Sequence, residues 1–334
     1  MFNFVINKLD SPAIANQGDV EKVRALSIDV YPKEVLKTKS VRQIADVEES
    51  GCVENEKPTE TKGDDEKEAQ NNDWKLSDFQ NEKRLGYGRF GKVYLVHEKS
   101  TKYVYAMKKQ TRDPMTEILV WREIGIQREL CHKNILRSYG YFFEDAQIYL
   151  ILEYAPYGNL RKKLDKQPYK RFDEKCAAKY INACADALSY LHERDIIHRD
   201  IKPENLLLSY NDRLKIADFG LSVNAQNQRR RTICGTPDYL PPEIMNGEPY
   251  SKEVDLWSLG VLSYDLLVGE WAFCGSSKEN IYWKTIRAKF NPFPDFLSQS
   301  AGNLIKRLIV VNPECRLTLF DVQNHPWIIA NNMP

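Results

Sequence analysis

Residues 198–205, with the sequence HRDIKPEN, place the strongest constraint on this chain, together with the Asp218-Phe219-Gly220 triplet that follows. Asp200 supplies a carboxylate, which can orient a hydroxyl nucleophile and accept its proton. Asn205 and Asp218 supply hard oxygen atoms of the kind that magnesium binds. Residues 206–217 between them are typical of two short strands joined by a turn. The spacing therefore indicates a loop that combines a proton acceptor with magnesium ligands.

A glycine-rich segment, residues 86–93, reads GYGRFGKV and lies between two stretches of alternating polar and apolar residues. Gly86, Gly88 and Gly91 allow a backbone to approach phosphates closely and to offer N–H groups to them. An ordinary hairpin turn is the alternative interpretation. The segment joins two strands instead of opening a helix, which argues against a dinucleotide-binding βαβ unit.

Lys108 follows Ala106 and Met107 on the next predicted strand. A lysine on a strand is usually a solvated edge residue, so the position alone carries little weight. The more specific interpretation is a lysine that binds the α- and β-phosphates of a nucleotide and is held by a glutamate on the following helix. Glu123, in the predicted helix 115–130, is the natural partner.

The distribution of strands and helices predicts an α+β chain with a small antiparallel lobe and a larger, mainly helical lobe. The small lobe, residues 74–153, carries one helix and the larger lobe covers residues 158–327, so that the domain spans 74–327 and a short tail, 328–334, follows. Residues 1–73 are so polar that we expect disorder, with a long surface loop as the alternative. Predicted strands lie in 79–96, 102–110, 135–143 and 147–154, and predicted helices in 173–193, 252–268, 277–288, 299–309 and 317–324.

Bulk properties argue against several kinds of protein. The net charge is only +1, which gives no reason to expect nucleic-acid binding. The 7 cysteines are scattered without a C-x-x-C pair, which is typical of reduced thiols in the cytosol or nucleus. The sequence contains neither a signal peptide nor an apolar run of the ~18 residues that a membrane span requires. We therefore expect no nucleic-acid partner and no membrane partner.

The ordered motifs resemble those of eukaryotic protein kinases from about residue 74 to 327, which implies a bilobal fold, ATP and Mg²⁺. The resemblance makes Asp200 the catalytic base, and it gives Lys202, a residue typical of serine/threonine kinases, the task of steadying the γ-phosphate. Asn205 and Asp218 would hold the metal. Residues implied at the nucleotide are Gly86, Gly88, Gly91, Val93, Ala106, Lys108, Glu123, Glu153, Ala155, Glu204, Asn205 and Asp218.

Longer segments resemble the Aurora kinases, among them KIADFGLSV, RRRTICGTPDYLPPEIM and VDLWSLGVLSYDLLVGE. The resemblance implies a mitotic role at centrosome and spindle, with a place in the cytoplasm and cytoskeleton and, in mitosis, in the nucleus or on chromosomes. It also implies a spindle- or microtubule-associated activator protein. Gly140 is slightly more typical of the Aurora A branch. Glu243, which closes the activation segment, is expected to pair with Arg316.

Thr232 is the activating phosphorylation site that this resemblance implies. A phosphate adds nearly two negative charges, which arginine guanidinium groups bind in bidentate fashion. The arginines of the implied clamp are Arg122, Arg199 and Arg230. A solvated basic loop is the alternative interpretation of this segment.

The expected substrates are proteins with basic residues before the serine or threonine. Glu204 and Asp265 are candidate acceptors for a substrate arginine, although either could form an internal ion pair instead. Two other classes remain open at this point. One is a related kinase of the AGC or polo-like groups, and the other is a pseudokinase scaffold that binds partners without catalysis.

Overall fold

The computed structural model describes residues 74–88, 91–112, 117–225 and 230–332, so the predicted tail at residues 1–73 lies outside it. The described residues form two compact units. The sheet unit comprises the described residues up to Cys131 together with Arg137–Tyr154. The helical unit comprises His132–Leu136 and the described residues from Ala155 onward.

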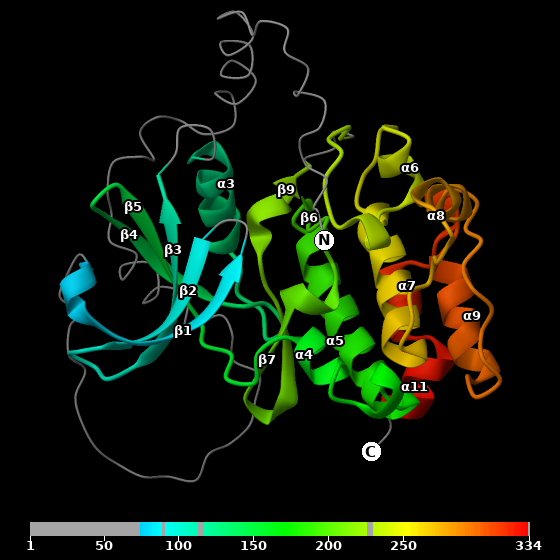
Figure 1. The fold of residues 1–334 in the computed structure, drawn as a ribbon, viewed down its shortest axis with the longest axis horizontal. Helices are drawn as coiled ribbons and strands as arrows, with labels where there is room; N and C mark the ends of the chain where they lie inside the picture. Colours follow the sequence, from blue (N-terminus) through cyan, green and yellow to red (C-terminus); the bar gives the residue numbers. More distant parts are fainter. Residues whose placement is uncertain (1–73, 89–90, 113–116, 226–229, 333–334) are drawn as a thin grey trace, which may run out of the picture. The chain divides into compact units, whose positions relative to one another are not determined.

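The sheet unit is built on five antiparallel strands in the order β1-β2-β3-β5-β4 (Figure 1). Alternating apolar residues place one row of side chains in a small core that includes Phe79, Met107 and Phe142. The predicted pair of strands in 79–96 and the predicted strands 102–110 and 147–154 are confirmed. The strands are β1 Phe79–Gly88, β2 Gly91–Glu98, β3 Val104–Thr111, β4 Ser138–Glu144 and β5 Gln147–Leu152.

One α-helix, α3 (Glu117–Gln127), belongs to the sheet unit. The first residues of the predicted helix 115–130 lie outside the described residues, and residues 128–130 form a turn instead. Trp121 of α3 packs on two aromatic rings of β4, with ring centroids 5.6 Å from Tyr141 and 5.3 Å from Phe143. These contacts fix the helix on the sheet through apolar surface.

The prediction that the fourth strand starts at residue 135 is wrong. β4 starts at Ser138, and Ile135 instead forms a parallel bridge with Ile216 inside the helical unit. The Leu136 N–H donates to the Ile216 carbonyl at 2.9 Å, and the Ile216 N–H donates to the Asn134 carbonyl at 2.8 Å. An apolar run does not reveal which backbone it will pair with, because both pairings bury the same side chains.

The helical unit surrounds α7 (Glu253–Val268), which packs against α5 (Glu174–His192) and α9 (Gln299–Leu308). α5 begins at Asp173, whose Oδ1 accepts the Cys176 N–H at 2.7 Å. α7 ends at Gly269, where a left-handed φ of 80° suits glycine. The other α-helices are α4 Leu160–Leu164, α6 Pro242–Met245, α8 Lys278–Thr285, α10 Leu319–Gln323 and α11 Pro326–Asn332.

Two small strand pairs complete the helical unit. β7 (Leu206–Ser209) pairs with β8 (Arg213–Ile216), as expected from the sequence, and β6 (Ile196–Ile197) pairs with β9 (Val223–Asn224). The α+β class with an antiparallel sheet and a mainly helical part is thus confirmed. None of the described helices combines the length and the apolar character that crossing a membrane requires.

The predicted ion pair between Glu243 and Arg316 is confirmed. Arg316 Nη1 and Nη2 lie 2.7 and 2.8 Å from the two carboxylate oxygens of Glu243. The side chains are 0% and 5% exposed, respectively. Arg316 also donates to the Glu253 carbonyl at the start of α7, so the pair ties α6, which carries Glu243, to the central helix.

Candidate active site

In the sheet unit, Lys108 and Glu123 form a buried ion pair. The Lys108 Nζ lies 2.5 Å from Glu123 Oε1, and Gln110 Nε2 donates to the other carboxylate oxygen at 3.4 Å. β3 supplies the lysine and α3 supplies the glutamate. Because neither side chain is well solvated, the carboxylate fixes the direction of the ammonium group.

The glycine-rich turn joins β1 and β2, with Gly88 opposite Gly91 in the register. Gly91 has a φ of 144°, and a Cβ atom at this position would clash with the Lys109 carbonyl oxygen. Close packing on β3 therefore requires this glycine. At Gly86, by contrast, a Cβ atom would meet no other atom within 4 Å. Residues 89–90 at the tip lie outside the described residues.

The other predicted nucleotide residues take part in strand pairing or in backbone hydrogen bonds within their own units. Val93 lies opposite Lys108, and Ala106 lies opposite Leu152, so both belong to the central strands of the sheet. The Glu153 N–H donates to the Arg137 carbonyl at 2.9 Å. Ala155, at the start of the long helical segment, accepts the Gly158 N–H at 3.3 Å.

In the helical unit, Asp200 is the centre of a hydrogen-bonded group. Thr236 Oγ1 donates to its Oδ1 at 2.7 Å, and Asn205 Nδ2 donates to its Oδ2 at 2.8 Å. The Lys202 Nζ lies 2.7 Å from Oδ2 and 2.5 Å from Thr236 Oγ1. Direct contacts therefore hold the carboxylate, the ammonium group and the hydroxyl group together.

Asp255 of α7 fixes the backbone of the loop at residues 198–205, here called the catalytic loop. Its carboxylate accepts the backbone N–H groups of His198 and Arg199 at 2.9 and 2.8 Å, and it lies 2.9 Å from His192 Nε2. Burial opposes ionisation, but the hydrogen bonds from His192 and His198 hold the pKa of Asp255 below its ordinary value. Arg199 has a left-handed φ of 68°, which these contacts stabilise.

Burial gives the structure a pH dependence that can be measured. Burial lowers the pKa values of His132, His198 and His325 from 6.5. The unfolded chain therefore binds more protons than the folded chain as the pH falls through 6.5, and protonation favours unfolding. We expect the melting temperature to be constant near pH 7.5 and to fall between about pH 6.5 and 5. Thermal melts between pH 5 and 7.5 measure this fall. A melting temperature that stays constant over the whole range would contradict the prediction.

Asp218 adopts a left-handed φ of 63°, which is unusual for a residue other than glycine. Its carboxylate accepts the Gly220 N–H at 3.4 Å. Phe219 is fully buried, with its ring centroid 5.2 Å from that of His198. The hydrogen bond from Gly220 and the packing of Phe219 on His198 thus hold the chain at this position.

The predicted phosphate clamp is only partly assembled among the described residues. Arg199 Nη1 donates to Tyr250 Oη at 2.8 Å, and Tyr250 Oη donates to the Thr232 carbonyl at 2.8 Å. Arg230 pairs with Tyr250 through the backbone, while its side chain donates to the Asn224 carbonyl. Thr232 itself is exposed. Arg122 belongs to the other unit.

Glu204 and Asp265 both accept hydrogen bonds from Arg161. Arg161 Nε lies 3.2 Å from Glu204 Oε1, and its two terminal nitrogens lie 3.3 and 2.5 Å from the Asp265 carboxylate. Of the two roles that the sequence leaves open for these acids, the internal ion pair is the one present.

The atoms at the catalytic loop suit a magnesium ion and a nucleotide. Asn205 uses its amide nitrogen for both of its hydrogen bonds to Asp200, so its amide oxygen is the atom available to a cation. Within the described parts of the chain, His, Cys, Asp and Glu alone form no cluster that could hold a metal. Magnesium usually combines one or two protein oxygens with phosphate oxygens and water.

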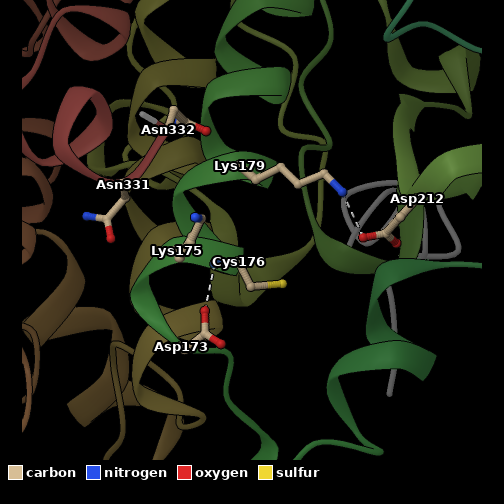
Figure 2. A pocket seen from close by; sticks show the side chains of 7 residues that line it. All are labelled: Asp173, Lys175, Cys176, Lys179, Asp212, Asn331 and Asn332. Atoms are coloured by element: carbon tan, nitrogen blue, oxygen red, sulfur yellow. Dashed lines mark hydrogen bonds and ion pairs between the residues drawn. The ribbon is translucent and has the colours of Figure 1, made fainter. Parts of the chain in front are cut away.

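A surface pocket at the start of α5 has a different character (Figure 2). Lys179 Nζ and Asp212 Oδ2 form an ion pair at 2.9 Å on its wall. Burial raises the pKa of the Cys176 thiol, which makes it a poor nucleophile at neutral pH. None of the predicted site residues lines this pocket, so it carries no part of the candidate chemistry.

Sequence reasoning missed four residues of this site: Thr236, Tyr250, Asp255 and Arg161. Thr236 lies in the conspicuous GTP triplet, which could have signalled a contact with the catalytic loop. Tyr250 and Asp255 contact residues that lie 51 and 56 positions earlier in the chain, and no local pattern reveals such contacts. Arg161 contacts Asp265, which lies 104 positions later in the chain.

The comparisons with known proteins agree with this geometry. Residues 79–328 match the protein kinase domain family. The fold and the loop around Asp200 thus define a protein kinase. The chain is 44% identical to Aurora kinase A-A of Xenopus laevis over 290 residues, which are 86% of this chain and 70% of that protein.

Two further relatives narrow the family. The chain is 48% identical to Aurora kinase B of Danio rerio over 261 residues, which cover 77% of this chain and 81% of the relative. It is also 48% identical to an Aurora kinase of Schizosaccharomyces pombe over 255 residues, 75% of this chain and 71% of the relative. The chain belongs to the Aurora kinase family and is a serine/threonine protein kinase. The chain is thus similar to A and B members at comparable identities, 44% and 48%.

Proposed function

We propose that this protein transfers the γ-phosphate of magnesium-bound ATP to serine and threonine residues of mitotic proteins at the centrosome and spindle. The observation that carries this proposal is the preassembled group of Asp200, Lys202, Asn205 and Thr236. The family supplies the reaction class, and the Aurora relatives support the mitotic setting. ATP and a divalent metal follow from the family, and magnesium is our assignment.

In this proposal Asp200 orients the substrate hydroxyl group and accepts its proton. Thr236 and Asn205 hold the carboxylate in place, which leaves it little freedom to turn away from the nucleophile. Lys202 carries a positive charge beside Asp200 and stabilises the negative charge on the transferred phosphoryl group. The bound metal would neutralise phosphate charge, with Asn205 and Asp218 as its protein ligands.

Residues of the sheet unit supply most of the remaining contacts to the nucleotide. Lys108, held by Glu123, binds the α- and β-phosphates. The backbone of the glycine-rich turn at Gly86, Gly88 and Gly91 covers the phosphates. Val93, Ala106, Glu153, Ala155 and Glu204 complete the proposed nucleotide residues. We further propose a kinase domain over residues 74–327, flanked by tails at 1–73 and 328–334.

Phosphorylation of Thr232 is the proposed switch. The hydroxyl is exposed and thus accessible to a kinase. Its carbonyl is already joined through Tyr250 to Arg199, the neighbour of Asp200. The buried Nε of Arg230 has no hydrogen-bond partner among the described residues, and a phosphate oxygen would provide one. Arg122, on α3, is the third proposed member of the clamp.

Replacing Thr232 with alanine is expected to lower the rate of phosphate transfer at least about tenfold, because the variant cannot form the charge-assisted hydrogen bonds of a phosphate. Initial rates and mass spectrometry of the activation segment measure the effect. Phosphatase treatment should slow the unmodified protein to a similar rate and leave Thr232→Ala unaffected. Equal rates for the phosphorylated protein and the variant would contradict the switch.

An activator protein is proposed to bind the aromatic surface of the sheet unit, defined here by Ile118, Trp121, Tyr141 and Phe143. Ile118 and Phe143 are 39% and 43% exposed, and ring contacts of Trp121 with Tyr141 and Phe143 make the surface continuous. The surface includes α3, which carries Glu123, so a partner there could stabilise the ion pair with Lys108. A spindle- or microtubule-associated protein fits the proposed location in the cytoplasm and cytoskeleton, and in mitosis in the nucleus or on chromosomes.

A further inference from the structure

Arg161 lies inside an acidic cluster beside the catalytic loop. The cluster consists of Glu204, Asp238 and Asp265, with Tyr239 and Trp271 on its sides. The guanidinium group of Arg161 makes a bidentate contact with Asp265 and a third hydrogen bond to Glu204. Tyr239 Oη accepts from Nη2 at 3.3 Å, and the Trp271 ring centroid lies 5.4 Å from the guanidinium carbon.

Two short chain segments place this cluster near the reacting atoms. Glu204 follows Asp200 by four residues, so their Cα atoms lie at most about 14 Å apart. Tyr239 follows Thr236, whose hydroxyl group donates to Asp200, by three residues. A peptide bound in an extended conformation advances about 3.3 Å per residue. Side chains a few residues from the target hydroxyl group can therefore reach the cluster.

The cluster remains negative even with Arg161 in place. Two carboxylates, those of Glu204 and Asp265, contact the single guanidinium group of Arg161. Asp238 lies close enough for the charges of Glu204 and Asp265 to raise its pKa, although burial is the larger cause. Glu204 is the accessible member, with 43% of its side chain exposed, whereas the side chains of Arg161 and Asp265 are 19% and 5% exposed. A second guanidinium group could approach Glu204 from solvent, but Arg161 already uses the buried acceptors.

We propose that Arg161 is a specificity-determining residue that occupies the place of a substrate arginine and so weakens the selection for basic residues next to the target. This inference rests on the proposed function, since it concerns how that site selects its peptides. The geometry supports this proposal because the guanidinium group of Arg161 binds the carboxylates of Asp265 and Glu204 in the way that a substrate guanidinium group would. A substrate arginine must share Glu204 with Arg161 or displace it.

The test compares binding of two short peptides that carry alanine at the target position. One peptide has arginines two and three residues before that position, and the other has alanines there. Fluorescence anisotropy gives the ratio of their dissociation constants for the full chain. We expect the unmodified protein to favour the arginine peptide by less than about threefold and Arg161→Gln to favour it about tenfold or more.

Arg161→Gln keeps a hydrogen-bond donor for buried Asp265, and two further variants make the result decisive. Arg161→Lys retains the charge but cannot bridge both carboxylates, so its ratio of dissociation constants should lie between those of the unmodified protein and Arg161→Gln. Glu204→Gln, added to Arg161→Gln, should abolish the gain. An unchanged ratio in both Arg161 variants would overturn the inference. Because binding is measured without catalysis, a protein that gains selectivity but transfers no phosphate would refute the proposed function alone.

Discussion

Replacing Asp200 with asparagine is expected to lower the rate of phosphate transfer by about 10²- to 10⁴-fold, the usual contribution of a positioned general base. The asparagine has nearly the same volume and can still accept a hydrogen bond from Thr236. It cannot take the proton of the substrate hydroxyl group. The Michaelis constant for ATP should change little, because Asp200 is assigned no contact with the nucleotide.

Asp212 provides a matched control. Its carboxylate accepts hydrogen bonds from Lys163, Lys179 and Tyr180 at 2.6, 2.9 and 2.7 Å, so it has partners of the same chemical kinds as Asp200. It lies on the β7–β8 turn and outside the catalytic loop. Asp212→Asn should therefore keep transfer within a few fold of the unmodified rate. Comparable losses in the two variants would show that any disturbed aspartate impairs the fold, and would contradict the role of Asp200.

Removal of Glu243 is expected to have the largest effect on stability. Glu243→Ala leaves the guanidinium group of Arg316 buried without its carboxylate, and breaking a buried pair in this way typically costs about 3–5 kcal/mol. For a domain of this size, each kcal/mol shifts the melting temperature by about 2–4 °C. The carbonyl groups of Val310 and Glu253 still accept from Arg316 and should place the loss toward the lower end.

The exposed pair between Arg112 and Glu117 is the control for that experiment. Its N···O distance of 2.9 Å is similar, but the side chains are 53% and 26% exposed. Glu117→Ala should therefore cost less than about 1 kcal/mol. Urea unfolding of both variants measures the difference. A loss below 1 kcal/mol for Glu243→Ala would mean that the buried pair contributes no more than a surface pair.

The sequence predicted those parts of the fold in which local pattern and burial agree. α5 is amphipathic and begins at a capping aspartate, and its predicted range, 173–193, lies within one residue of the helix at each end. The β2–β3–β5 sheet follows from alternating residues, and the pair of Glu243 and Arg316 follows from family resemblance. Residues 135–137 were wrongly assigned to the fourth strand because a short apolar run has no pairing preference of its own.

In the candidate site, too, local sequence pattern predicted some residues and missed those that depend on tertiary packing. The ordered motifs brought out Asp200, Lys202, Asn205 and Asp218, which lie close together in the chain. The residues that fix their geometry come from distant positions: Asp255 through two backbone N–H groups, and Thr236 through its hydroxyl group. Arg161 meets Asp265 across 104 positions, a contact that depends on how α4 and α7 pack together. Such contacts follow from tertiary packing, which single-sequence patterns do not encode.

The most direct test of the account is phosphate transfer from radiolabelled ATP to a serine peptide with upstream arginines, in the presence and absence of magnesium. The unmodified chain, phosphorylated on Thr232, should label the serine only with the metal present, and Asp218→Asn should abolish the labelling. Failure to label any peptide, with ATP bound and Thr232 phosphorylated, would contradict the claim that this arrangement of residues transfers phosphate.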